Sequence, residues 1–213
     1  MKTDDLITML SSGPDVALAA RPVRADLLPL LAGLVASGAI MLALLDLNPQ
    51  LSRAALFADF WIKLVFSLAL AGAGWLAARQ LARPGARGAW PALWLGLPVL
   101  SLWCLAAAAL AQAAPEARAE LFWGRTWRYC PLLIALMSLP LLGAALRVMR
   151  TLAPTRLRLA GAAAGLAAGA AAAAVYCLHC PELSPVFVGF WYVLGMLIPS
   201  ALGALIGPRV LAW

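Results

Sequence analysis

Three cysteines and the single histidine of the chain are the residues best able to do chemistry. Cys177, His179 and Cys180 lie within one short stretch, Tyr-Cys-Leu-His-Cys-Pro-Glu, between two long apolar runs. A second Cys-Pro pair begins at Cys130 and opens an earlier apolar run. Thiols beside an imidazole can form a disulfide, react with an oxidant or bind a soft metal ion. The pattern predicts a small sulfur site if the fold brings the two Cys-Pro pairs together.

Three interpretations of these cysteines compete. A structural disulfide is the simplest, because oxidising compartments favour disulfides. A reactive or metal-capturing sensor site would use Cys130 and Cys180, with Cys177 and His179 as accessory groups. A disulfide-exchange enzyme is the third interpretation; the CxxC spacing of Cys177 and Cys180 suits it, but such an enzyme also needs a quinone site and a second, well-separated cysteine pair. Cys104 lies in the middle of an apolar run, where cysteine is an inert filler.

The elements that must position these residues are membrane spans. The chain has 213 residues, of which 64% are hydrophobic and 12% charged, whereas soluble domains are about half apolar and about a quarter charged. Six apolar runs reach the ~20 residues that cross a ~30 Å hydrocarbon core. They cover residues 27–45, 56–78, 91–112, 130–149, 158–178 and 185–207. The sequence therefore predicts an all-α integral membrane protein with six transmembrane helices surrounded by lipid.

Basic residues are distributed unequally between the connections. The N-terminal tail, the even-numbered loops and the C-terminal end hold eleven of them, Lys2, Arg21, Arg24, Arg79, Arg83, Arg87, Arg147, Arg150, Arg156, Arg158 and Arg209. The odd-numbered loops hold four, Arg53, Arg118, Arg125 and Arg128. Because cytoplasmic loops carry the excess of Lys and Arg, we expect both termini in the cytoplasm and the Cys-Pro pairs on the outer face. The net charge of +7 then reflects topology and not direct binding to nucleic acid, which needs one basic face.

The chain divides into a polar N-terminal segment, residues 1–25, and a six-helix transmembrane domain, residues 26–213. A threonine followed by two acids predicts a helix that begins at Thr3, because the acids complement the free amides of its first turn. Apolar residues then form a short face with no evident use inside the chain, and such a face docks in a groove on a partner. The predicted partner-binding residues are Asp4, Asp5, Leu6, Ile7 and Leu10.

The fifth and sixth runs carry small residues at helical spacing. Gly161, Gly165 and Gly169 form a doubled small-xxx-small pattern, and Gly203 and Gly207 repeat the spacing. This pattern lets two helix backbones approach closely. Because alanine is only weakly apolar, the alanine-rich fifth run is expected inside the bundle.

Residues for catalysis are scarce. No Asp, Glu or His lies deep in a predicted span, so a proton-driven transporter lacks its usual titratable groups. There is no phosphate-binding loop or HExxH motif, and the single histidine leaves no candidate for a Ser-His-Asp set. Lys63 lies inside the second run with Asp59 one turn before it, so we expect its ammonium to reach toward that acid. The chain is predicted not to be an enzyme and to need no cofactor.

The whole pattern resembles the NrsF family of membrane anti-sigma factors. The matching stretches are residues 1–7, 22–24, Cys130-Pro131 with Ser138 and Pro140, 153–156, 178–182 and 203–209. The resemblance implies a multi-pass protein of the bacterial inner membrane whose cytoplasmic face holds an extracytoplasmic-function sigma factor inactive.

The resemblance also implies a signal. Oxidants or heavy metals would act at Cys130 and Cys180, as reacting thiols or as metal ligands, and would release the sigma factor. Two features depart from the family: Cys177 stands at an ordinary apolar position, and the segment after Leu10 has fewer basic residues. The alternative class is a membrane thiol-disulfide redox protein or a small transporter, which a bound quinone or turnover of a substrate would distinguish.

Overall fold

The computed structural model describes residues 3–11, 23–82 and 90–212, and within these ranges every regular element is a helix. The first half contains α1 (Thr3–Ser11), α2 (Val23–Leu44), α3 (Leu51–Ala54), α4 (Ala58–Leu81), α5 (Trp90–Gln112) and α6 (Pro115–Trp123). The second half contains α7 (Cys130–Arg150), α8 (Leu157–Tyr176), α9 (Pro185–Phe187), the π-helix η1 (Val188–Tyr192) and α10 (Val193–Val210).

The six predicted spans are confirmed as helices long and apolar enough to cross a membrane. The fourth, expected at residues 130–149, runs from Cys130 to Arg150. The fifth was expected to reach residue 178, but α8 ends at Tyr176. The reason is Pro181, which disfavours helical conformation in the residue before it and so requires the chain to leave the helix earlier. The sixth span consists of α9, η1 and α10 in succession.

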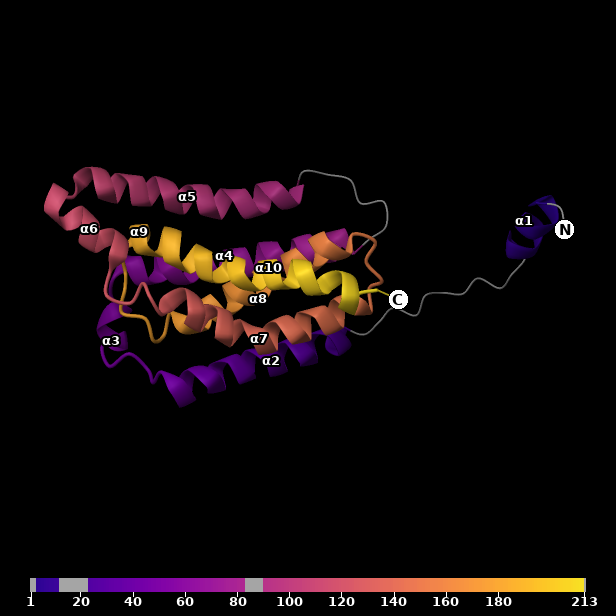
Figure 1. Ribbon diagram of the computed structural model, residues 1–213, viewed down its shortest axis with the longest axis horizontal. Helices are drawn as coiled ribbons and strands as arrows, with labels where there is room; N and C mark the ends of the chain where they lie inside the picture. The colour runs from indigo at the N-terminus through magenta and orange to yellow at the C-terminus, as the bar shows by residue number, and fades with distance from the viewer. Residues whose placement is uncertain (1–2, 12–22, 83–89, 213) are drawn as a thin grey trace.

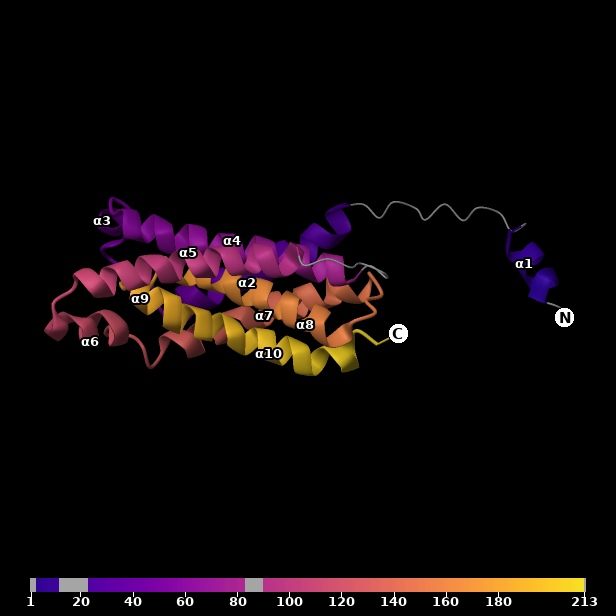
Figure 2. The same ribbon diagram turned by 90° about the horizontal axis from the view of Figure 1, so that it is seen from above.

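The spans form a bundle around α8 (Figures 1 and 2), which packs against α10, α4, α7 and α2. At one edge, α5 packs on α4, α9 and η1; at the other edge, α2 packs on α7. The short helices α3 and α6 lie at one end of the bundle together with the chain that follows α8 (Figure 1). We call this the cysteine end. The start of α2 and the ends of α7 and α10 lie at the opposite end.

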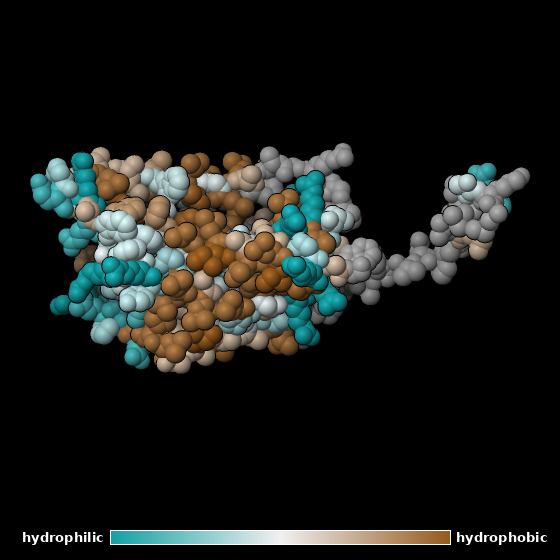
Figure 3. All heavy atoms as spheres, in the orientation of Figure 1, coloured by the Kyte–Doolittle hydropathy of each residue, from teal (hydrophilic) through white to brown (hydrophobic). Residues whose placement is uncertain are grey.

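A hydrophobic belt covers the middle of the bundle. Figure 3 shows apolar residues across the centre of one face and hydrophilic residues gathered at both ends. Large apolar side chains of the peripheral helices point outward, among them Leu28, Val35 and Leu97. Such a surface is unfavourable in water and suits the hydrocarbon core of a bilayer. The belt is consistent with a multi-pass membrane protein.

Small residues bring α8 and α10 into backbone contact. A Cβ added at Gly161 would collide with the carbonyl group of Gly203, and one added at Gly165 with the carbonyl group of Pro199. At Gly169 the added carbon would meet the ring of Pro199 at 2.7 Å. The predicted glycine seam is therefore confirmed, and it joins two helices of the same chain. The central position of α8 is confirmed as well, since it is the most buried of the six spans.

Gly165→Ala is expected to destabilise the protein by about 1–3 kcal/mol, because the new methyl group forces α8 and α10 apart. Thermal unfolding of the purified protein in detergent measures the effect. The matched control is Gly143→Ala on α7, where an added Cβ meets nothing within 4 Å; that change should be neutral or slightly stabilising, since alanine favours helix more than glycine. Equal melting temperatures for the two variants would contradict the seam.

Candidate functional site

Residues 177–182, here called the cysteine turn, link the end of α8 to the sixth span. The turn closes through two hydrogen bonds, in which the amides of His179 and Cys180 donate to the carbonyl oxygen of Tyr176, each at 3.0 Å. Cys177 and Cys180 are both buried although they lie at the end of the bundle. The thiols are therefore covered by neighbouring elements and do not face the surface.

The fold brings Cys130 and Cys180 together. Cys130 is the first residue of α7, and its amide donates to the carbonyl oxygen of Thr126 at 3.0 Å. Its fully buried thiol lies within hydrogen-bonding reach of the sulfur of Cys180. The hydroxyl of Thr126 lies 4.0 Å from that same sulfur. All four cysteines are free thiols, and Cys104 lies apart from the others on the exposed side of α5.

Lys63 on α4 is the cation of this site. Its ammonium donates to the carbonyl oxygens of Cys180 at 2.9 Å and of Glu182 at 3.0 Å, and the side chain is 1% exposed. The expectation that it reaches toward Asp59 is wrong, since Asp59 is exposed. A buried ammonium needs nearby acceptors, and an exposed ion pair adds little. The free carbonyl groups of the cysteine turn meet that need.

The two cysteines of the turn differ in acidity. The hydrogen bond from the thiol of Cys130 lowers the pKa of Cys180 to about 6; burial opposes this change, and the positive charge of Lys63 assists it. Burial raises the pKa of Cys177 to about 11, against smaller opposing contributions from Lys63 and Ser67. The thiolate is the reactive form of cysteine. These shifts favour the thiolate at Cys180 over the thiolate at Cys177.

Tyr192, the last residue of η1, completes the cluster. Its side chain is fully buried, and its hydroxyl has no hydrogen bond of ordinary geometry within the described part of the chain. The hydroxyl faces the sulfurs of Cys177 and Cys180, and its ring packs on that of Tyr176 at 5.8 Å. Sequence reasoning missed this residue, because an aromatic residue in an apolar run is usually a core or interface side chain. π-Helical turns are frequent at functional sites, but the sequence carries no clear mark of one.

His179 and Glu182 fix the turn to neighbouring loops. The Nδ1 atom of His179 lies 2.9 Å from the carbonyl oxygen of Asp46, in the connection between α2 and α3. A carboxylate oxygen of Glu182 accepts the amide of Arg125 at 2.7 Å. Gly124 lies beside this carboxylate with φ +52°, and an added Cβ would stand 2.9 Å from it. These contacts position the turn, so the structure places His179 as a support of the cysteines.

Ligands for a metal ion are few. Across the described residues there is no group of three or more His, Cys, Asp and Glu side chains able to hold a metal ion. A soft ion would meet the sulfurs of Cys130 and Cys180, which are of the ligand type it prefers.

The predicted partner-binding helix is far from the cysteines of the site in the sequence. The predicted helix that begins at Thr3 is observed as α1, and Asp4 and Asp5 are exposed on it. The side chains of Leu6, Ile7 and Leu10 lie outside the described residues. The predicted partner-binding face remains a prediction.

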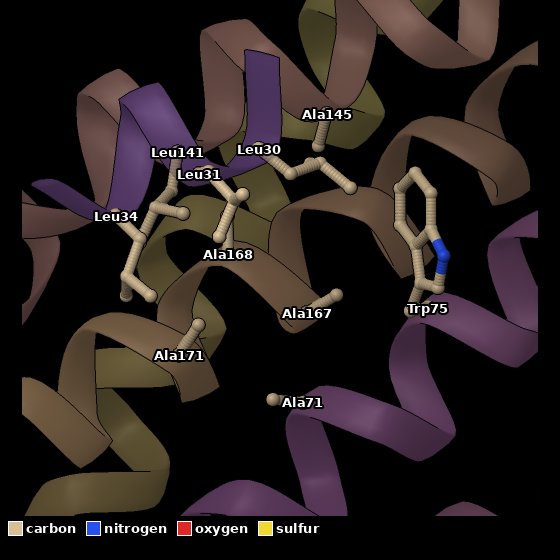
Figure 4. Close-up of a pocket in the computed structure, with 10 residues that line it drawn as sticks. All are labelled: Leu30, Leu31, Leu34, Ala71, Trp75, Leu141, Ala145, Ala167, Ala168 and Ala171. Atoms are coloured by element: carbon tan, nitrogen blue, oxygen red, sulfur yellow. The ribbon is translucent and has the colours of Figure 1, made fainter. Parts of the chain in front are cut away.

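A cavity of about 200 Å³ lies among α2, α4, α7 and α8 (Figure 4). Leucine and alanine side chains and the indole of Trp75 line it, and none of the cysteines does. This cavity carries no group for acid-base or redox chemistry. The candidate site is therefore the polar cluster of Lys63, Tyr192 and the three cysteines.

Comparison with known proteins gives a consistent result. A family model described as "NrsF: Negative regulator of sigma F" matches residues 11–213. A protein of Azospira oryzae named "Probable anti-sigma-F factor NrsF" is 53% identical over the whole of both chains. One of Caulobacter vibrioides named "Anti-sigma-F factor NrsF" is 37% identical, again over the whole of both chains. No solved structure matches this chain.

Proposed function

The chain belongs to the NrsF family, and we propose that it is a membrane anti-sigma factor which holds an extracytoplasmic-function sigma factor inactive. The observation that carries this proposal is the similarity to two relatives named as anti-sigma-F factors, which extends over the whole length of every chain. The six apolar helices agree with a multi-pass membrane protein. The partner is a protein, and the sigma factor itself contacts the nucleic acid.

The proposed orientation places both termini in the cytoplasm and the cysteine end outside, at the bacterial inner membrane. Its support is the excess of Lys and Arg in the N-terminal tail, the even-numbered loops and the C-terminal end. Reporter fusions within residues 79–90 and 147–158 should report the cytoplasm, and a fusion within residues 113–129 should report the outer compartment. An outer location for residues 147–158 would rule this orientation out.

The proposed signal is a reaction of oxidant or heavy metal at Cys130 and Cys180. These two sulfurs lie next to each other at the cysteine end, one at the start of α7 and the other in the turn that follows α8. At the other end, the same helices are linked by the short connection of residues 151–156. A tilt at the thiols is therefore transmitted through rigid helices to the face where the partner would bind, and the glycine seam of α8 is where the helices would slide.

The energies favour a bundle with two nearly balanced states. A complete reversal from bound to released partner needs about 5.5 kcal/mol of differential free energy. A disulfide supplies about 2–4 kcal/mol. The signal thus shifts an equilibrium between bound and released states that already differ little in free energy.

Deleting residues 2–12 is expected to leave the protein in the membrane and to free the sigma factor, because α1 carries the acids that would meet basic residues of a DNA-binding partner. Co-purification with the sigma factor and expression of its target genes measure the effect. Asp46→Asn, which removes an exposed acid at the cysteine end, is the matched control and should repress fully. Full repression by the deletion variant would count against the role of α1.

Cys130→Ser and Cys180→Ser are each expected to abolish induction by oxidant or metal while the sigma factor stays bound. The reason is that one remaining thiol can neither form the disulfide nor complete the pair of soft ligands. Cys104→Ser, at the exposed and separate cysteine, is the control and should respond as the unchanged protein does. Normal responses from both serine variants would mean that the two cysteines are structural.

A further inference from the structure

We propose that Cys180 is the thiol that a hydroperoxide oxidises first, that Lys63 and Tyr192 bind the oxygen atom added to its sulfur, and that Cys130 then displaces this oxygen to form the disulfide. The inference rests on the proposed function in one respect only: it takes Cys130 and Cys180 as the responding pair. It assigns distinct chemical roles to two cysteines that look equivalent in the sequence.

Lys63 supplies the first donor. An ammonium group carries three N–H donors, and the carbonyl oxygens of Cys180 and Glu182 take two of them, at 2.9 and 3.0 Å. The third has no acceptor of that kind among the described residues. The ammonium lies 6.0 and 5.7 Å from the rings of Phe60 and Tyr192, and its charge acts on the sulfurs of Cys177 and Cys180. A buried cation with a donor to spare beside Cys180 suits a negatively charged oxygen on that sulfur.

Tyr192 supplies the second donor. A buried hydroxyl without a hydrogen bond costs about 1–3 kcal/mol, so its persistence calls for an explanation. The hydroxyl of Tyr192 is such a group, and it faces the sulfur of Cys180. An oxygen atom on that sulfur would accept the missing hydrogen bond. The two donors come from different helices, α4 and η1, and converge on one atom.

Other groups around Cys180 do not offer the same arrangement. The carboxylate of Glu182 is occupied by the amide of Arg125, and His179 by the carbonyl group of Asp46. Cys177 and the ring of Tyr176 pack beside the cluster and bring no positive charge. Cys130 lies next to Cys180 at the start of α7. It is therefore placed to attack Cys180 once that sulfur carries a leaving group.

The proposed reaction balances with one hydroperoxide. The thiolate of Cys180 attacks the outer oxygen, so an S–O bond forms and the O–O bond breaks. The inner oxygen takes the proton that the outer oxygen carried and leaves as water or an alcohol. The sulfur is now a sulfenate, which Lys63 and Tyr192 hold. The sulfur of Cys130 attacks it, the S–S bond forms, and the oxygen leaves as water after taking the proton of Cys130 and one from solvent. Two thiols are oxidised to one disulfide, and one hydroperoxide is reduced. Hydrogen peroxide gives two molecules of water, and an organic hydroperoxide gives one of water and one of alcohol.

The oxidant must reach a buried sulfur. A cavity of about 430 Å³ lies at the cysteine end and is lined partly by Pro181 and Leu183 of the chain following Cys180 and by the polar side chains of Asn48 and Arg53. A small, polar peroxide can therefore approach the outer side of the cysteine turn. A local opening of this turn then exposes the sulfur, which is 2% exposed in the closed state.

The test uses the full-length protein in lipid nanodiscs without a sigma factor. Hydrogen peroxide is added together with dimedone, which traps sulfenic acids, and mass spectrometry locates the adduct. In Cys130→Ser, which blocks the second step, the adduct should appear on Cys180; in Cys180→Ser, none should appear on Cys130. An adduct on Cys130 at a similar rate would overturn the assignment.

Tyr192→Phe in the Cys130→Ser background tests the oxygen site. It should slow adduct formation about tenfold, as expected for one lost hydrogen bond to a charged atom. It should leave the temperature of thermal unfolding unchanged or raise it, because an unsatisfied buried hydroxyl is removed. Tyr129→Phe, on an exposed tyrosine, is the matched control. Equal rates for the two tyrosine variants would refute the role of Tyr192. Lys63→Met should slow the reaction further; where it does not fold, Tyr192→Phe decides.

The outcomes separate this inference from the proposed function. If the sulfenate forms on Cys180 but peroxide does not release the sigma factor in cells, the chemistry stands and the proposed signal is wrong. If peroxide releases the sigma factor through the cysteines without a sulfenate on Cys180, the proposed function stands and this inference falls.

Discussion

The buried ammonium of Lys63 is the interaction on which the cysteine end depends. Placing a charge in an apolar interior is costly unless acceptors surround it, and the two carbonyl groups of the cysteine turn provide them. In return, the ammonium donates to two backbone oxygens of the turn, which lies outside any helix. One contact thus anchors α4 to the turn, holds Cys180 beside Cys130, and places a positive charge next to the sulfur.

The same contact makes the site sensitive to displacement of α4 or of the cysteine turn. A charge stabilised by fixed carbonyl groups tolerates little displacement, because moving either partner leaves a buried polar group unsatisfied. The disulfide that we propose between Cys130 and Cys180 would draw α7 toward the turn, which Lys63 binds to α4. It would therefore change the packing of α4, α7 and α8. The glycine seam adds the freedom to respond, since α8 and α10 meet there through smooth backbone surfaces.

This arrangement agrees with the anti-sigma role that we propose for the chain. The described site places three thiols beside a buried cation, and the apolar cavity among α2, α4, α7 and α8 lies apart from the cysteines. A chemical event at one end of the bundle and a partner at the other require only rigid helices and two packing states of similar free energy.

The sequence by itself determined the six spans, the helix at the N-terminus and the glycine seam, because length, hydropathy and the spacing of small residues act locally along one helix. It also singled out Cys130 and Cys180, through prolines that end or begin a helix beside them. The partner of Lys63 was decided only by the tertiary structure. Asp59 is near in the sequence but exposed, whereas the carbonyl groups of Cys180 and Glu182 come within hydrogen-bonding distance of the ammonium only when α4 packs against the turn. The position of Tyr192 follows from the π-helical turn η1, whose extra residue in the turn depends on how the sixth span packs and leaves no pattern in the sequence.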